Sequence, residues 1–131
     1  MIHCIIVEDA PLAVDKLKNF ISKVPLLDLV GTFDNGLDAF DFLQSNTIDL
    51  LFLDIQMEQF TGIQLLKALH TRPHIIITSA YGEYAVEGFE YDVTDYLLKP
   101  YSFERFLKAV NKVQTEMASN PPAQPLPKDY I

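Results

Sequence analysis

Short apolar runs recur along this 131-residue chain, and longer segments with helical spacing separate them. The five runs cover residues 2–7, 27–33, 50–53, 75–78 and 96–98. Between the first two runs, Leu17, Phe20 and Ile21 fall at positions i, i+3 and i+4, which form one face of a helix. Strands that alternate with helices need crossover connections, so the strands run parallel and helices cover both faces of the sheet. The pattern therefore predicts an α/β fold.

Helices are predicted in the segments between and after these runs. The first begins at Pro11 and is closed by Pro25, because proline fits the first helical turn and cannot continue a helix. Others are centred on residues 37–43, 63–69 and 84–89, and the last follows Ser102, whose hydroxyl can cap it. Five parallel strands most simply adopt the doubly wound, flavodoxin-like order 2-1-3-4-5. A ligand site then lies at the carboxyl ends of strands one and three, where the order reverses.

The charge balance limits the partners of the chain. The 10 basic and 18 acidic side chains give a formal net charge of −8, which argues against binding of nucleic acid or a membrane surface. No apolar stretch approaches the ~20 residues of a membrane span, and the N-terminus lacks the features of a secretion signal. The single cysteine, Cys4, lies in an apolar run and is expected to be a buried thiol in a reducing compartment. We therefore predict a single cytoplasmic domain.

Charged and hydroxyl side chains stand where the predicted strands end. The first strand runs into Glu8 and Asp9, the third into Asp54, the fourth into Thr78 and Ser79, and the fifth into Lys99. Three carboxylates at one edge repel one another and need a cation, and hard oxygen ligands suit Mg²⁺. The ammonium would neutralise a phosphoryl oxygen, and a hydroxyl would donate a hydrogen bond to it. This set favours phosphoryl transfer, in which an aspartate can be the nucleophile.

Other interpretations of the same residues remain open on this evidence. Any one of the carboxylates alone could cap a helix. A Mg²⁺-dependent phosphatase with an aspartyl nucleophile would use a similar site, but such enzymes carry a second acid where this chain has Gln56. A flavin carrier would need a phosphate-binding loop after the first strand, where two carboxylates would repel the phosphate. The scattered histidines lack the spacing of a zinc site.

Four motifs follow one another along the chain, at residues 5–9, at 53–57 with Gly62 downstream, at 79–81 and at 95–100. In this order they make the chain resemble the receiver domain of response regulators in two-component signalling. The resemblance implies that Asp54 accepts a phosphoryl group from a sensor histidine kinase. It also implies that Mg²⁺ is held by Glu8, Asp9, Asp54 and the backbone carbonyl of Gln56.

The resemblance assigns roles to four further residues. Ser79 would be the hydroxyl that moves toward the phosphoryl group, and Tyr96 the aromatic side chain whose rotamer follows it. Lys99 would pair with a phosphoryl oxygen, and the peptide bond before Pro100 would be cis. Such a domain is a phospho-acceptor that catalyses only its own phosphotransfer and dephosphorylation, and it is not an enzyme for other substrates.

Some positions depart from the family pattern or leave a choice. Glu58 stands where the family has proline, which would alter the loop after the third strand and the metal affinity. Thr78 and Ser79 are adjacent hydroxyls, and strand alternation lets only one of them face the site. Ser79 is preferred because Ser79-Ala80 matches the hydroxyl–alanine pair of the family. On burial alone, Tyr96 and Tyr101 would be half-buried packing residues.

The chain is expected to be part of a larger regulator. The segment 79–100 resembles receivers that precede a LytTR-type DNA-binding domain, and residues 118–131 contain four closely spaced prolines. We therefore predict a receiver domain over residues 1–117 and a proline-rich linker or tail over 118–131 that leads to a C-terminal output domain. DNA would bind only through that output domain, which would control transcription. A stand-alone receiver acting through protein contacts is the alternative.

Self-association is predicted from charge and from the resemblance. Residues 1–98 hold 5 basic and 15 acidic groups, whereas residues 99–116 hold 4 basic and 2 acidic groups. A mildly basic last helix beside an acidic segment can pair with a second copy. We expect a weak homodimer through the face formed by the fourth helix, fifth strand and fifth helix.

Overall fold

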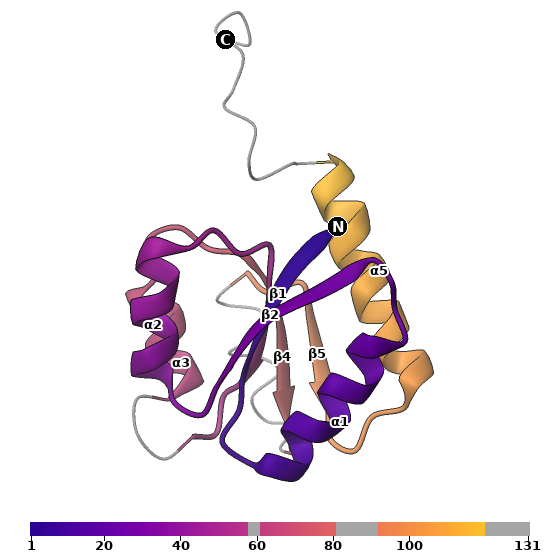
Figure 1. Ribbon diagram of the computed structural model, residues 1–131, viewed down its shortest axis with the longest axis horizontal. Helices are drawn as coiled ribbons and strands as arrows, with labels where there is room; N and C mark the ends of the chain where they lie inside the picture. The colour runs from indigo at the N-terminus through magenta and orange to yellow at the C-terminus, as the bar shows by residue number, and fades with distance from the viewer. Residues whose placement is uncertain (58–60, 81–91, 120–131) are drawn as a thin grey trace, which may run out of the picture.

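The computed structural model is a sheet covered by helices on both sides (Figure 1). It describes residues 1–57, 61–80 and 92–119. The five strands are parallel and pair in the order β2-β1-β3-β4-β5, which confirms the predicted doubly wound topology. Their bounds are β1 Ile2–Val7, β2 Leu27–Phe33, β3 Leu50–Asp54, β4 His74–Ser79 and β5 Asp95–Leu98.

Four helices lie in the described ranges: α1 Pro11–Ser22, α2 Gly36–Ser45, α3 Gly62–Ala68 and α5 Phe103–Ser119. The predicted starts of two helices are confirmed. Pro11 is in the first turn of α1, and Ser102 Oγ accepts a hydrogen bond from the N–H of Arg105 at the start of α5. The helix expected around residues 84–89 and the position of Glu58 lie outside the described residues.

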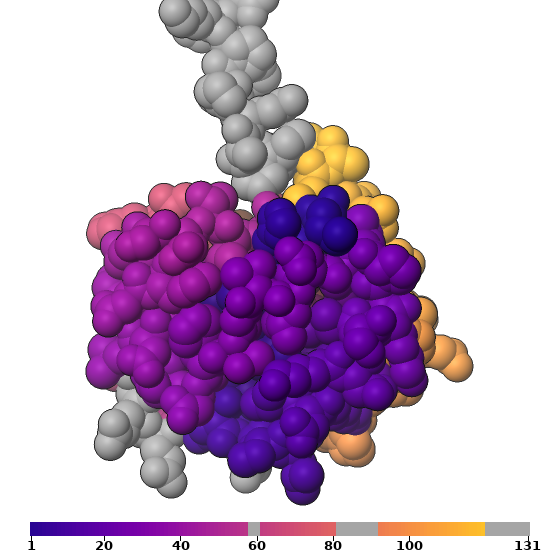
Figure 2. Space-filling model, viewed as in Figure 1, coloured from indigo at the N-terminus to yellow at the C-terminus, as the bar shows by residue number. Residues whose placement is uncertain are grey.

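The helices separate the core into two clusters, one on each face of the sheet. Figure 1 shows α1 and α5 on one side and α2 and α3 on the other. Leu17 and Phe106 belong to the first cluster, and Leu65 and Leu66 to the second. Figure 2 shows that side chains of α1, β2 and α2 cover the front of the molecule. Within the described ranges, every helix falls short of the length and apolar character that a membrane crossing needs.

One helix end differs from the prediction. α1 stops at Ser22, before Pro25, because the N–H groups of Lys23 and Val24 turn back to the carbonyls of Phe20 and Ile21. α5, the helix predicted after Ser102, runs through Ser119. The proline-rich residues 120–131 lie outside the described part of the chain.

Candidate functional site

The sheet brings the predicted site residues to one edge. β1, β3, β4 and β5 are consecutive neighbours and run parallel, so their carboxyl ends meet at the end of the sheet to which the arrows of β4 and β5 point in Figure 1. β1 ends beside Glu8, β3 at Asp54, β4 at Ser79, and β5 one residue before Lys99. The topology thus assembles residues that are up to 91 positions apart in the sequence.

Three carboxylates form the centre of this edge. Glu8, Asp9 and Asp54 each offer an oxygen within 4.8 Å of the others, so the set could hold a metal ion. Glu8 and Asp54 are buried, whereas Asp9 is exposed. The Ala10 N–H donates to Glu8 Oε2 over 3.2 Å and fixes the β1–α1 turn around this carboxylate. Mg²⁺ keeps several of its water ligands when it binds to carboxylate oxygens. A group of two buried carboxylates and one exposed carboxylate therefore suits this ion.

Lys99 joins β5 to the two buried carboxylates. Its Nζ donates to Glu8 Oε1 over 2.6 Å and lies 3.9 Å from Asp54 Oδ1. These contacts link the ends of three strands, because Lys99 follows β5, Asp54 ends β3 and Glu8 follows β1. The ammonium thereby partly offsets the charge of a cluster that would otherwise be strongly repulsive.

The environment of Asp54 favours its protonated form. The pKa of Asp54 is raised from 3.8 to about 7, first because burial disfavours the charged form and then because of the neighbouring Glu8 carboxyl group. The Gln56 N–H, which donates to Asp54 Oδ1 over 3.1 Å, and the Lys99 ammonium act in the opposite direction. A divalent cation beside these oxygens would favour the ionised form, so the donor set fits a bound Mg²⁺.

The two hydroxyls at the end of β4 differ in their surroundings. Both Thr78 and Ser79 are buried, and the Ser79 carbonyl accepts from the Lys99 N–H over 2.7 Å. The Thr78 hydroxyl is buried and has no hydrogen-bond partner in the structure of the described residues. Thr78 is the register partner of Asp54 in the β3–β4 pair, and Ser79 lies one position further along the strand.

The other predicted site residues lie around this centre. Tyr96 is partly exposed on β5 and packs against the core cluster of α2 and α3. The Lys99–Pro100 peptide bond is cis. Tyr101 is buried, and the Lys16 ammonium lies 4.4 Å from its ring centroid, so this tyrosine is more buried than expected.

Sequence reasoning missed the ionic contact that fastens β5 to α5. Arg105 donates to both carboxylate oxygens of buried Asp95, over 2.8 and 2.7 Å, and Lys112 Nζ lies 3.4 Å from the same carboxylate. Burial would raise the pKa of Asp95, but the Arg105 hydrogen bonds, the Tyr96 N–H and Lys112 outweigh it and hold the pKa below its usual value. The only available signal in the sequence was an acidic residue directly before a predicted strand, Asp95 before residues 96–98.

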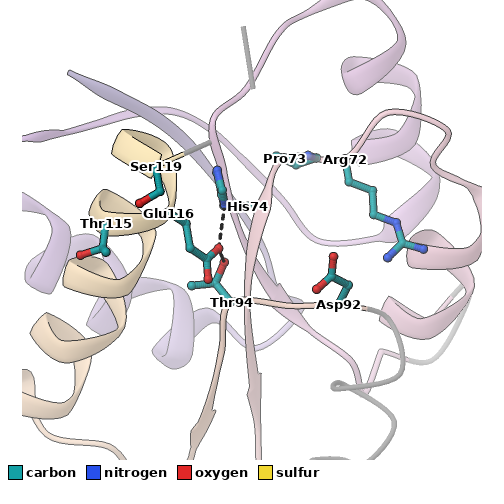
Figure 3. A pocket seen from close by; sticks show the side chains of 8 residues that line it. All are labelled: Arg72, Pro73, His74, Asp92, Thr94, Thr115, Glu116 and Ser119. Carbon is teal, nitrogen blue, oxygen red and sulfur yellow. Dashed lines mark hydrogen bonds and ion pairs between the residues drawn. The ribbon is translucent and has the colours of Figure 1, made fainter. Parts of the chain in front are cut away.

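A cavity lined by described residues lies at the opposite edge of the sheet. It has a volume of about 470 Å³ and lies where β4 and β5 begin and α5 ends. Figure 3 shows Glu116 of α5 directed toward His74, and both His74 Nδ1 and Thr94 Oγ1 contact Glu116 Oε1, over 3.0 and 2.8 Å. None of the three carboxylates lines this cavity, so its size does not identify it as the site of the chemistry.

Comparisons with known proteins agree with the geometry. Residues 4–111 match the family described as the response regulator receiver domain. Transcriptional regulatory protein YpdB of Escherichia coli (strain K12) is 39% identical over 126 residues, which cover 91% of this chain and 52% of YpdB. Sensory transduction protein LytR of Staphylococcus haemolyticus is 36% identical over 119 residues, which cover 88% of this chain and 46% of LytR.

A solved structure extends the agreement to three dimensions. The response regulatory domain of protein mrkE from Klebsiella pneumoniae has a TM-score of 0.84 and 37% identity, and the match covers 91% of this chain and 100% of that one. The chain spans about half the length of the curated relatives, and it matches this separately solved domain in full.

Proposed function

Since this chain belongs to the response-regulator receiver family, we propose that Asp54 accepts a phosphoryl group from a sensor histidine kinase. The observation that supports this role is the buried Asp54 carboxyl group, which lies within 4.8 Å of two further carboxylates and 3.9 Å from the Lys99 ammonium. In the transfer, a carboxylate oxygen of Asp54 forms a bond to phosphorus. The bond between phosphorus and the donor breaks, and its electron pair leaves with the donor.

Mg²⁺ fits the same residues. Glu8, Asp9 and Asp54 would hold it together with the backbone carbonyl of Gln56, and when bound it would neutralise charge on the transferring phosphoryl oxygens. The chain itself positions the nucleophile, because the Gln56 N–H donates to Asp54 Oδ1 and fixes the carboxyl group. Lys99 would exchange its contact with Glu8 for one with the phosphoryl group.

The response would pass from the phosphoryl group to β4 and β5. Ser79 would donate its hydroxyl to a phosphoryl oxygen, and Tyr96 would change rotamer with it. Lys99 directly follows β5, so a shift of its side chain would act on the start of the β5–α5 connection. A local change of charge would thereby bias the surface of β5 and α5.

The whole regulator would use this change to control transcription. We infer a LytTR-type DNA-binding domain after the proline-rich residues 118–131, a sensor histidine kinase as the upstream partner, and a cytoplasmic location. The relatives YpdB and LytR are a transcriptional regulator and a sensory transduction protein, and each extends well beyond the matched region. The net charge of −8 agrees with DNA binding outside this chain.

A small phosphodonor tests the acceptor role directly. We expect acetyl phosphate with Mg²⁺ to add the mass of one phosphoryl group to the chain, and Asp54→Asn to remove this adduct. Asp41→Asn, at an exposed position of α2, is the matched control and should be modified as the parent is. No adduct on the parent, or an adduct that persists in Asp54→Asn, would disprove the assignment.

A further inference from the structure

The Thr78 hydroxyl is a buried polar group for which the unmodified protein provides no hydrogen bond. Thr78 is 1% exposed, and its Oγ1 has no hydrogen-bond partner among the described residues. Buried hydroxyls are nearly always paired, because an unpaired one loses its hydrogen bonds to water without compensation. A valine side chain has the same shape and would fill the position without this cost. The presence of a hydroxyl group at this position therefore suggests that it has a function.

The strand register places Thr78 beside the nucleophile. In the parallel β3–β4 pair, Thr78 is the register partner of Asp54, and register partners direct their side chains to the same face of a sheet. Two residues earlier on each strand, Phe52 and Ile76 both belong to the core cluster of α1 and α5. Alternation along the strands therefore puts Asp54 and Thr78 on that face, and puts Ser79 on the face of α2 and α3. Since β4 ends at Ser79, the Ser79 hydroxyl would approach the phosphoryl group beyond the end of the strand, whereas Thr78 lies beside the Asp54 carboxyl group itself.

The contacts of Lys99 complete this arrangement. Its ammonium contacts Glu8, which follows β1, and Asp54, which ends β3, and β4 is the strand between β3 and β5. Thr78 is the residue that β4 contributes next to Asp54 in the register. Thr78 thus lies on β4, the strand between β3, which carries Asp54, and β5, which Lys99 follows.

We propose that Thr78 is a positioning residue of the phosphoryl site, with a hydrogen bond that forms only in the phosphorylated state. The proposal rests on the proposed function, because it requires Asp54 to be modified. Once one Asp54 oxygen is bonded to phosphorus and Lys99 has turned toward the phosphoryl group, Thr78 Oγ1 donates its hydrogen to the carbonyl oxygen that remains on Asp54. The cost of the unpaired hydroxyl in the unmodified state is thereby relieved in the modified one, which favours the switch.

Thr78→Val tests this role because it removes the hydroxyl and keeps the shape. Without ligand, Thr78→Val should melt at a temperature equal to or above that of the parent, since an unpaired buried hydroxyl is lost. With Mg²⁺ and beryllofluoride as a stable phosphoryl mimic, its affinity for the mimic should fall about three- to tenfold, the effect of one hydrogen bond. Thr78→Ser keeps the hydroxyl and should retain most of the affinity of the parent.

Thr94→Val is the matched control at the far edge of the sheet. The Thr94 hydroxyl donates to Glu116, as Figure 3 shows, so its removal should lower the melting temperature and leave the affinity for beryllofluoride unchanged. Equal affinity of Thr78→Val and the parent would overturn the proposal, and so would a lower melting temperature of Thr78→Val without ligand. If the parent itself binds no mimic and forms no phosphoryl adduct, the acceptor role fails instead.

Discussion

The Asp54 carboxyl group makes the stability of the metal-free protein depend on pH. Its pKa is raised to about 7 by burial and by Glu8, so between pH 4 and 7 the folded state keeps a proton that the unfolded state releases. Stability should therefore fall as the pH rises through this range. Asp54→Asn should be more stable than the parent at pH 8 by at least about 1 kcal/mol, and the difference should vanish near pH 4.

Urea unfolding in the presence of a chelator measures this difference. Asp41→Asn, at an exposed position on α2, serves as the control and should follow the parent at every pH. A gain for Asp54→Asn that does not change between pH 4 and 8 would show that the burial of Asp54 carries no titration cost.

Protons should compete with Mg²⁺ for the same oxygens. Because the pKa of Asp54 is about 7 without a cation, the Mg²⁺ affinity should fall by a factor that approaches ten per pH unit below 7. Asp9→Asn should weaken binding at least about tenfold at pH 8, since it removes the exposed member of the three carboxylates. Calorimetric titration measures both effects, and a pH-independent affinity would exclude Asp54 as a ligand.

At the scale of the elements, Gly62 sets how closely α3 approaches β3. A Cβ at this position would lie 2.6 Å from Ile55 Cα and 2.7 Å from the carbonyl oxygen of Asp54, and neither backbone atom can move away easily. Gly62→Ala should therefore destabilise the fold by about 2–4 kcal/mol and displace the backbone of Asp54 and Ile55. Gly31→Ala is the control, because its nearest contact is a phenylalanine side chain at 3.3 Å, which can adjust. Similar losses in denaturant unfolding would contradict this explanation.

The contact between Asp95 and Arg105 should hold α5 to the sheet. Arg105→Met would leave the buried Asp95 carboxylate without its paired hydrogen bonds and cost about 1–3 kcal/mol at pH 7, a range reduced for the partial exposure of Arg105. The pKa of Asp95 is lowered in the folded protein, so this contribution is present above its usual pKa and is lost as the pH falls below it. Urea unfolding at pH 7 and pH 2 should show a large and a small difference, respectively; equal differences would point to packing alone.

The elements that the sequence predicts are those in which local pattern and tertiary environment agree. The uncharged run ending at Asp54 is buried along its whole length, as a central parallel strand must be, and Pro11 and Ser102 mark helix starts through local backbone chemistry. The clustering of Glu8, Asp54 and Lys99 also follows from the strand order. The pairing of Asp95 with Arg105 does not follow, because it depends on the position of α5 against β5, which no spacing in the sequence specifies.

At the scale of the molecule, the weak homodimer through the face of the fourth helix, β5 and α5 stays a prediction, and the fourth helix lies outside the described residues. Leu98 on β5 is 49% exposed, and an exposed apolar side chain on this face is a natural point to test. Leu98→Asp should abolish association that sedimentation detects for the Mg²⁺–beryllofluoride form, because the carboxylate would be desolvated in the interface. Leu12→Asp, on the exposed surface of α1, should leave association unchanged. Equal loss in both variants would place the dimer interface elsewhere.

The contacts of Lys99 also bear on how the protein is made. Glu8, Asp9 and Asp54 are synthesised well before residue 99, and β5, which pairs with β4, is the last of the five described strands in chain order. Until then Glu8 and Asp54 lack the Lys99 ammonium that offsets their charge in the folded domain. A nascent chain that stops before residue 99 would therefore carry the proposed acceptor without the residue proposed to pass on its response. The two would come together only when β5 pairs with β4.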